Sequence, residues 1–395
     1  MKKFLIVALI SITIQLSAQD TQGIQFFEDT WAATLEKAKT DNKVIFLDAY
    51  ASWCSPCKRM AKNVFPQQKV GEYYNSNFIP VKIDMQKGEG KTIAQTYRVS
   101  AYPTFLFIDK NGEVVHRAVG EKSASEFIIL GKIALDTSKN LMGIRNKYEN
   151  NPMNPDKVLL YCNALKQGYD KSYQAVAEKY LGSISKTRLL EHKSWMIINS
   201  YIEKLSSPYI EYVVENRKLY AEKHGEDRVD QKINQVVEIE VYAAYRNKDT
   251  MALSNLAGTI NRLNLKQKDY HHAMINLRKS MITRNWESYG KSVIDVISYK
   301  PNITETEINS YAWNCYMFVN DEATLNTLIG KLDTFIIVEH GYPIHDTYAS
   351  LLYKTGAYEK ALTEANKAIE LAKAAGNSYT QTTELIEKIK EDMAK

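Results

Sequence analysis

The sequence contains few of the residues that characterise several protein classes. Only four cysteines occur in 395 residues, too few for the disulfide scaffold of a small secreted domain. Nine prolines and 17 glycines exclude a collagen-like or low-complexity chain. Repeated apolar runs of about 20 residues are absent, which excludes a polytopic membrane protein. The composition, 45% hydrophobic and 25% charged, is that of a globular protein with two or three domains.

The net charge of +5 is also small for a chain of this length. Two of the five charges are Lys2 and Lys3, and residues of both signs are interspersed along the rest of the sequence. This even distribution indicates neither a nucleic-acid surface nor a surface for anionic membranes. We therefore expect no nucleic-acid partner.

Residues 1–18 have the three parts of a secretory signal peptide. Two lysines form the basic part, residues 4–14 the apolar part, and Leu16-Ser17-Ala18 precedes the expected cleavage site. The apolar part is too short to span a bilayer, so we expect no stable membrane insertion. The alternative is an uncleaved N-terminal anchor. Both predict export, and we assign the protein to the periplasm, where paired cysteines can form disulfides.

The 26 tyrosines indicate two kinds of domain, because five lie in residues 1–135 and 21 in residues 136–395. Strand and helix signals alternate in the first part, as in an α/β domain, and helical periodicity dominates the second. After the signal peptide we predict an α/β domain at 19–135, a helical domain at 136–300 and helical repeats at 301–395.

The α/β part contains a continuous apolar run, Val44-Ile45-Phe46-Leu47, which is typical of a buried central strand. Ser123 and Glu126 have capping-box spacing and predict a helix over Ala124–Leu135. Further helices are expected around Trp31–Ala38, from Cys54 towards Val64, and before Tyr97. The other expected strands are Phe78–Ile83, Thr104–Ile108 and Glu113–Val119.

An internal repeat lies near the C-terminal end of the sequence. Residues 309–312 (Asn-Ser-Tyr-Ala) match residues 346–349 (Asp-Thr-Tyr-Ala) at an offset of 37. The second copy continues with small and aromatic residues over 353–368 and resembles a tetratricopeptide repeat. We predict an all-α helical-repeat region; the alternative is a helical bundle without repeats.

The chemistry is expected at Cys54-Ser55-Pro56-Cys57. A Cys-x-x-Cys pair that follows an apolar strand and opens a helix indicates a redox pair. The first helical turn stabilises a Cys54 thiolate, the nucleophile of disulfide exchange. Cys57 lies one turn further on, and the φ angle of Pro56 suits this turn. No second ligand pair occurs at zinc-finger spacing, so we expect no metal and no cofactor.

These motifs resemble the thioredoxin superfamily over roughly residues 26–135, under a third of the mature chain. The resemblance rests on Trp53 with the cysteine motif, on Asp48 six residues before Cys54, on Val81-Lys82-Ile83-Asp84, and on residues 97–104 (Tyr-Arg-Val-Ser-Ala-Tyr-Pro-Thr). It implies the thioredoxin fold, a central mixed sheet flanked by helices, and an exported thiol–disulfide oxidoreductase with a redox-active Cys54–Cys57 disulfide. Ser55 departs from the Gly of cytosolic thioredoxins, which leaves the redox potential open.

The resemblance also assigns roles to four further residues. It implies a cis Tyr102–Pro103 bond facing the cysteines; an ordinary proline at the start of an edge strand is the alternative. Asp48 would be a buried carboxylate with a raised pKa that relays a proton near Cys57; an ordinary strand-end aspartate is the alternative. Trp53, with Pro56 and Tyr102, would form the surface that binds the substrate.

Two functions follow as hypotheses. The first is exchange of disulfides with client proteins, in the reducing direction, with an electron donor that the sequence does not identify and with a protein partner on the helical domain. The second is a helical-repeat interaction protein that carries an accessory thioredoxin-like module. Cys162 and Cys315 fall on apolar helix faces and are expected to be buried free thiols, with a bridge between them as the alternative.

Overall fold

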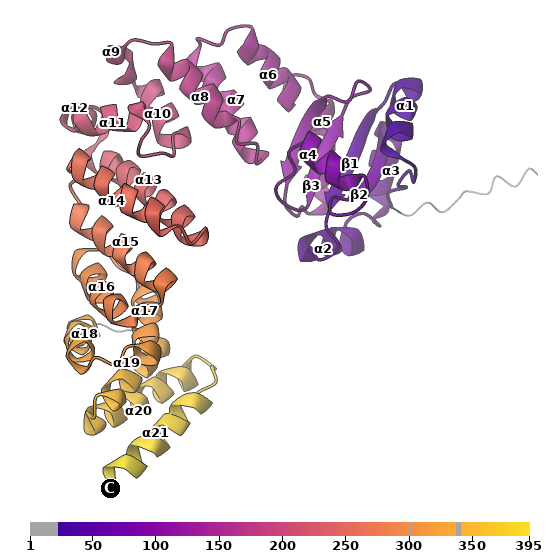
Figure 1. Cartoon of the computed structure of the whole chain (residues 1–395). Helices are drawn as coiled ribbons and strands as arrows, with labels where there is room; N and C mark the ends of the chain where they lie inside the picture. Colours follow the sequence, from indigo (N-terminus) through magenta and orange to yellow (C-terminus); the bar gives the residue numbers. More distant parts are fainter. Residues whose placement is uncertain (1–22, 301, 337–340) are drawn as a thin grey trace, which may run out of the picture. The chain divides into compact units, whose positions relative to one another are not determined.

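The computed structural model describes residues 23–300, 302–336 and 341–395. The signal peptide predicted for residues 1–18 lies outside this part of the chain. Up to Leu135 the chain contains both strands and helices, and only helices follow (Figure 1). The chain divides into two compact units between Tyr201 and Ile202, and each unit is described separately.

The first unit contains a four-stranded mixed sheet in the order β2-β1-β3-β4. The central strand β1 pairs parallel with β2 and antiparallel with β3, and β3 pairs antiparallel with β4. Five consecutive residues of β1 are buried because helices cover both faces of the sheet. The α/β fold class is thereby confirmed. The strands are β1 (Val44–Tyr50), β2 (Phe78–Asp84), β3 (Thr104–Ile108) and β4 (Val114–Val119).

Five helices flank this sheet. They are α1 (Trp31–Asp41), α2 (Ser55–Asn63), α3 (Gln68–Asn77), α4 (Gly90–Thr96) and α5 (Ala124–Leu135). The capping box of α5 is present as predicted, with Ser123 and Glu126 each bonded to the other's backbone. In contrast, α3 has no counterpart among the predicted elements. Its Gly71 is unfavourable in a helix but required here, because a Cβ would lie 2.1 Å from the carbonyl oxygen of Gly23.

An aromatic core on one face of the sheet positions the cysteine helix. Phe46 of β1 contacts the rings of Tyr74 and Phe127 at centroid distances of 4.8 and 5.4 Å. The Tyr74 hydroxyl donates a hydrogen bond of 2.7 Å to the carbonyl of Phe127. Met60 of α2 belongs to the same core. Because side chains alternate along a strand, Asp48 lies on the same face as Phe46, beneath α2.

Five more helices complete the first unit: α6 (Leu141–Glu149), α7 (Pro155–Gln167), α8 (Tyr173–Gly182), α9 (Lys186–Leu189) and α10 (His192–Tyr201). Of these, α6 packs against the edge strand β4. The buried Arg117 of β4 donates hydrogen bonds to the carbonyls of Tyr97 and Arg98 and lies 3.8 Å from Asp170, beyond α7. A Cβ on Gly168 would lie 2.7 Å from the Arg117 side chain, so glycine permits the close approach of this loop to the sheet.

The second unit is entirely helical in its described residues. Neighbouring and alternate helices both pack together, including α13 with α14 and with α15, and α17 with α19. α17 and α19 begin 37 residues apart, the offset of the sequence repeat. The tetratricopeptide-like assignment stays a prediction. The helices are α11 (Pro208–Glu215), α12 (Arg217–His224), α13 (Glu226–Arg246), α14 (Thr250–Leu263), α15 (Lys268–Thr283), α16 (Trp286–Tyr299), α17 (Glu305–Phe318), α18 (Glu322–Phe335), α19 (Tyr342–Lys354), α20 (Tyr358–Ala374) and α21 (Thr380–Met393).

Cys162 of α7 and Cys315 of α17 are free and buried, which confirms the favoured interpretation of these two cysteines. Burial raises the pKa of each thiol to about 12. Neither forms the thiolate that disulfide exchange requires at neutral pH. Among the helices of the described residues, none is both long and apolar enough to cross a membrane.

Candidate active site

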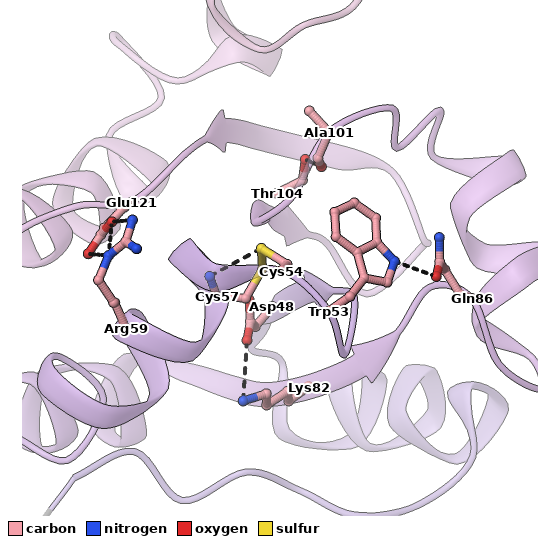
Figure 2. The surroundings of a disulfide bond; sticks show 10 residues. All are labelled: Asp48, Trp53, Cys54, Cys57, Arg59, Lys82, Gln86, Ala101, Thr104 and Glu121. Atoms are coloured by element: carbon pink, nitrogen blue, oxygen red, sulfur yellow. Dashed lines mark hydrogen bonds and ion pairs between the residues drawn. A yellow bond between two sulfur atoms is a disulfide. The ribbon is translucent and has the colours of Figure 1, made fainter. Parts of the chain in front are cut away.

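The cysteine pair lies at the start of α2 (Figure 2). Cys54 and Cys57 form a disulfide, with their Cα atoms 5.3 Å apart. Cys54 is the N-cap residue, and its sulfur accepts a hydrogen bond of 3.2 Å from the Cys57 N–H. Pro56 occupies the first turn of the helix, where backbone N–H groups have no partner within the helix, so proline costs no hydrogen bond. The sequence therefore places the Cys54 sulfur at the positive end of a helix, an environment that stabilises a thiolate after reduction.

Both cysteines lie just below the surface, each 3% exposed. Ala51, Tyr50 and Tyr102 pack around them. On the outer side of α2, Arg59 holds Glu121 through two nitrogens, the shorter contact being 2.6 Å. This hydrogen bond lowers the pKa of Glu121 below its usual value. Figure 2 shows the disulfide between Trp53 on one side and the Arg59–Glu121 ion pair on the other.

Asp48 lies beneath the disulfide, with its carboxylate towards Lys82 (Figure 2). The residue is 1% exposed, and neither carboxylate oxygen accepts a hydrogen bond from the described residues. Burial raises the pKa of Asp48 to about 7, and the charge of Lys82 opposes this rise only in part. Near neutral pH, Asp48 can thus both take up and release a proton.

Lys82 is held beside Asp48 by aromatic rings. Its ammonium nitrogen lies 3.9 Å from the Asp48 Oδ2 atom and 4.8 Å from the centroid of the Tyr50 ring. The rings of Phe65 and Phe26 lie at 5.7 and 6.0 Å. No role of Lys82 is predicted from the sequence, although it belongs to one of the motifs. The one indication of a role is its charge at the position of β2 that pairs with Asp48 in the strand register.

Trp53 is the most prominent exposed side chain beside the cysteine pair, at 64% exposure. Its indole N–H donates a hydrogen bond of 2.7 Å to the side-chain oxygen of Gln86. The Tyr102 ring meets the indole edge-on, with the centroids 5.9 Å apart. Gln86 was not among the predicted site residues, because it lies in the loop after β2 and no motif contains it. It fixes the orientation of the exposed indole.

The Tyr102–Pro103 peptide bond is cis, as the resemblance implies. Pro103 is buried, and its carbonyl accepts a hydrogen bond of 2.9 Å from the N–H of Gly120. The Thr104 hydroxyl donates to the carbonyl of Ala101 at 2.7 Å. These bonds fix the segment that leads into β3. Its pairing with an extended substrate stays a prediction.

The loop between β2 and α4 carries Gly88 and Gly90. A Cβ on Gly90 would lie 2.1 Å from the carbonyl oxygen of Asp84, so this position has no room for a side chain. Glycine at this position thus allows the tight turn by which the chain enters α4, close to Gln86. In the described part of the chain, no group of three or more His, Cys, Asp or Glu side chains is arranged to hold a metal ion.

Comparison with known proteins places this geometry in a family. Residues 31–133 match the family of thioredoxin-like domains. The chain is 42% identical to thioredoxin H4 of Arabidopsis thaliana over 92 residues, which are 23% of this chain and 72% of that protein. It is 37% identical to thioredoxin H-type 2 of Nicotiana tabacum over 94 residues, 24% of this chain and 74% of that protein.

The chain belongs to the thioredoxin-like family. Among solved structures, a proposed disulphide isomerase of Bacteroides thetaiotaomicron is 41% identical, with a TM-score of 0.28, over 29% of this chain and 96% of that one. The membership concerns the thioredoxin-like domain, which has the disulfide-oxidoreductase fold and a closed Cys54–Cys57 pair. The matches to these two thioredoxins span 92 and 94 of the 395 residues.

Proposed function

We propose that the protein is an exported thiol–disulfide oxidoreductase that reduces disulfides of client proteins. The observation that carries this proposal is the Cys54–Cys57 disulfide at the N-terminus of α2, with Asp48 beneath it and the exposed Trp53 beside it. Nucleophile, resolving thiol and proton acceptor come from adjacent elements, β1 and α2, of a rigid sheet-and-helix frame. The thioredoxin relatives support the same chemistry.

The reaction consists of two exchanges between sulfur atoms. In the reduced protein, the Cys54 thiolate attacks one sulfur of a client disulfide, and the other client sulfur leaves as a thiolate. Cys57 then loses its proton and attacks Cys54 in the mixed disulfide. The client's second thiolate leaves, and the Cys54–Cys57 disulfide forms again. Two electrons have passed to the client, and a separate thiol donor must return two to the protein.

Asp48 is the group we assign to the proton of Cys57. Its pKa of about 7 lets it accept this proton when Cys57 attacks and release it when the pair is reduced again. Lys82 offsets the charge of the ionised form at 3.9 Å. Without the neighbouring ammonium group, the carboxylate would be still harder to ionise in this buried position.

The direction of exchange is a separate prediction. We expect the reduction potential of the Cys54–Cys57 pair to lie nearer to about −270 mV, the value of a reducing thioredoxin, than to about −120 mV, that of a strong oxidant. Equilibration of the purified protein with dithiothreitol or glutathione buffers, followed by thiol alkylation and mass analysis, measures it. A potential near the oxidising value would contradict the reducing direction while leaving the exchange chemistry intact.

Export rests on the signal peptide predicted for residues 1–18. We expect the mature protein to begin at Gln19, and N-terminal sequencing of the protein isolated from its own cell tests this. A sequence that begins at Met1 in a cytoplasmic fraction would contradict export.

The second candidate is an interaction protein in which the helical region acts and the redox domain is accessory. The helices from α6 onwards occupy most of the chain, and those from α15 onwards share a core in the second unit, which favours a binding role for this region. The two candidates differ in what Cys57→Ser captures: covalently held clients indicate the enzyme, and only non-covalent partners indicate the interaction protein.

A further inference from the structure

The second unit contains a cavity of about 200 Å³ that is distant in sequence from the cysteine pair. Three alternate helices, α13, α15 and α17, form its walls, and Lys300, the C-cap residue of α16, also lines it. On α15 the lining residues run from Tyr270 to Arg278 along one face. These two residues are eight positions apart, so the lining extends over roughly 12 Å of α15.

Much of the cavity wall is apolar and aromatic. Val237 and Val241 of α13 face it together with Met274 of α15. The rings of Tyr270 and Tyr311 add aromatic surface. A wall of this kind binds the apolar body of a ligand, since burial of apolar surface drives such binding.

The two ends of the cavity differ in charge. At one end the charged groups already have partners: Lys300 forms an ion pair with Glu307, and Glu238 accepts a hydrogen bond of 3.0 Å from the Tyr270 hydroxyl. At the other end, Arg278 has no carboxylate within ion-pair distance among the described residues. Its guanidinium stacks on the Tyr245 ring at 5.0 Å and donates only to the sulfur of Met281. This cation is therefore available to an anionic ligand.

A second observation at the same place is the side chain of His271. It lines the cavity and is 1% exposed, yet neither ring nitrogen has a hydrogen-bond partner in the described chain. Burial lowers its pKa to about 4, so the ring is neutral and offers one donor and one acceptor. A buried polar group without a partner is costly, and a polar atom of a bound ligand would remove that cost.

We propose that this cavity binds a small carboxylic acid with an apolar or aromatic body. The carboxylate pairs with Arg278, the body packs on Met274 and the tyrosine rings, and a polar atom reaches His271. An arginine fork matches a carboxylate with two hydrogen bonds, which gives the ligand one orientation. The site is independent of the disulfide chemistry, so its failure and the failure of the proposed function are distinguishable.

The probe is 3-phenylpropionate, titrated into the full-length protein by isothermal titration calorimetry. We expect saturable one-to-one binding with a Kd in the high-micromolar to millimolar range, as for a ligand of this size. The uncharged 3-phenylpropionamide has the same shape and should bind at least about tenfold more weakly. The methyl NMR signal of Met274, assigned with Met274→Leu, should shift on binding and thereby locate the ligand.

Arg278→Met should weaken binding of 3-phenylpropionate by about tenfold or more, while Arg278→Lys keeps the charge and a measurable part of the affinity. Arg262→Met is the control, because Arg262 of α14 forms an ion pair with Glu211 and neither residue lines the cavity. Circular dichroism checks that each variant is folded. Insulin reduction should be unchanged in all three.

The carboxylate can belong to a free acid or to the end of a polypeptide. A short peptide ending in phenylalanine and its C-terminal amide separate these sources: tighter binding of the acid peptide than of 3-phenylpropionate identifies a chain end, and weaker binding identifies a free acid. The proposal is overturned if neither carboxylate binds, if the amides bind equally well, or if folded Arg278→Met keeps the full affinity.

Discussion

Asp48→Asn is expected to stabilise the oxidised protein by about 4 kcal/mol at pH values above 8. The raised pKa of Asp48, about 7 against 3.8 for an ordinary aspartate, means that the folded state holds its proton more tightly than the unfolded state does. Each unit of pKa difference corresponds to about 1.36 kcal/mol. Asparagine has nearly the same shape as the protonated acid and cannot ionise, so it avoids the cost of a buried charge.

The sign of the pH dependence follows from the same shift. Below about pH 3.8 Asp48 is protonated in both the folded and the unfolded state, and its favourable contribution to the free energy of unfolding is fully present. Between about pH 3.8 and 7 only the unfolded state ionises, so the free energy of unfolding falls as the pH rises. Above about pH 7 Asp48 is ionised in both states, and its contribution to the free energy of unfolding has been lost completely. Wild type and Asp48→Asn should therefore be equally stable near pH 3.5 and differ most at pH 8 and above.

Urea unfolding of both proteins at pH 3.5, 6 and 8.5 measures this difference, and the transition that moves identifies the thioredoxin-like domain. Lys82→Met is the companion variant. With Asp48 present, losing the ammonium at 3.9 Å should destabilise the protein further at pH 8.5. In the Asp48→Asn background the same change should have no such pH-dependent effect. If the difference in the free energy of unfolding between wild type and Asp48→Asn is the same at all three pH values, the assigned pKa is contradicted.

In Cys54→Ser, the rate of insulin reduction is expected to fall to the background rate of dithiothreitol alone. The hydroxyl of serine is not ionised at neutral pH and cannot form a mixed disulfide, so no exchange begins. Cys162 and Cys315 cannot substitute, because both are buried and the pKa of each thiol is raised to about 12. The measurement is the turbidity of reduced insulin with time, and Cys162→Ser is the matched control that should keep full activity. Full activity of Cys54→Ser would contradict the assignment of the nucleophile.

Local patterns in the sequence predict much of the first domain. The apolar run at Val44 becomes the central strand, and Ser123 with Glu126 caps α5, because both depend on neighbours within a few residues. The cysteine motif likewise places its own helix start. In contrast, α3 escapes prediction because its Gly71 contradicts helix propensity, and the close contact with Gly23 that explains it is about 50 residues away in sequence.

The parts of the site that sequence patterns miss are contacts between separate elements. Gln86 reaches Trp53 across 33 residues, and neither residue type indicates the bond. Lys82 gains its role only when the strand register sets it against Asp48. The cavity at Arg278 combines three helices without a shared motif, so only packing brings its residues together. The many tyrosines of this region are consistent with the aromatic side chains in the cavity wall.

The most direct test of the account is the capture of a mixed disulfide by Cys57→Ser. Reduced Cys57→Ser protein is mixed with a disulfide-containing client such as insulin, alkylated, and analysed by mass spectrometry and non-reducing electrophoresis. Without the resolving thiol, the client should remain attached to Cys54, and dithiothreitol should release it. The Cys54→Ser/Cys57→Ser double variant should capture none. Absence of a client bound through Cys54, or equal capture by the double variant, would contradict the proposed exchange.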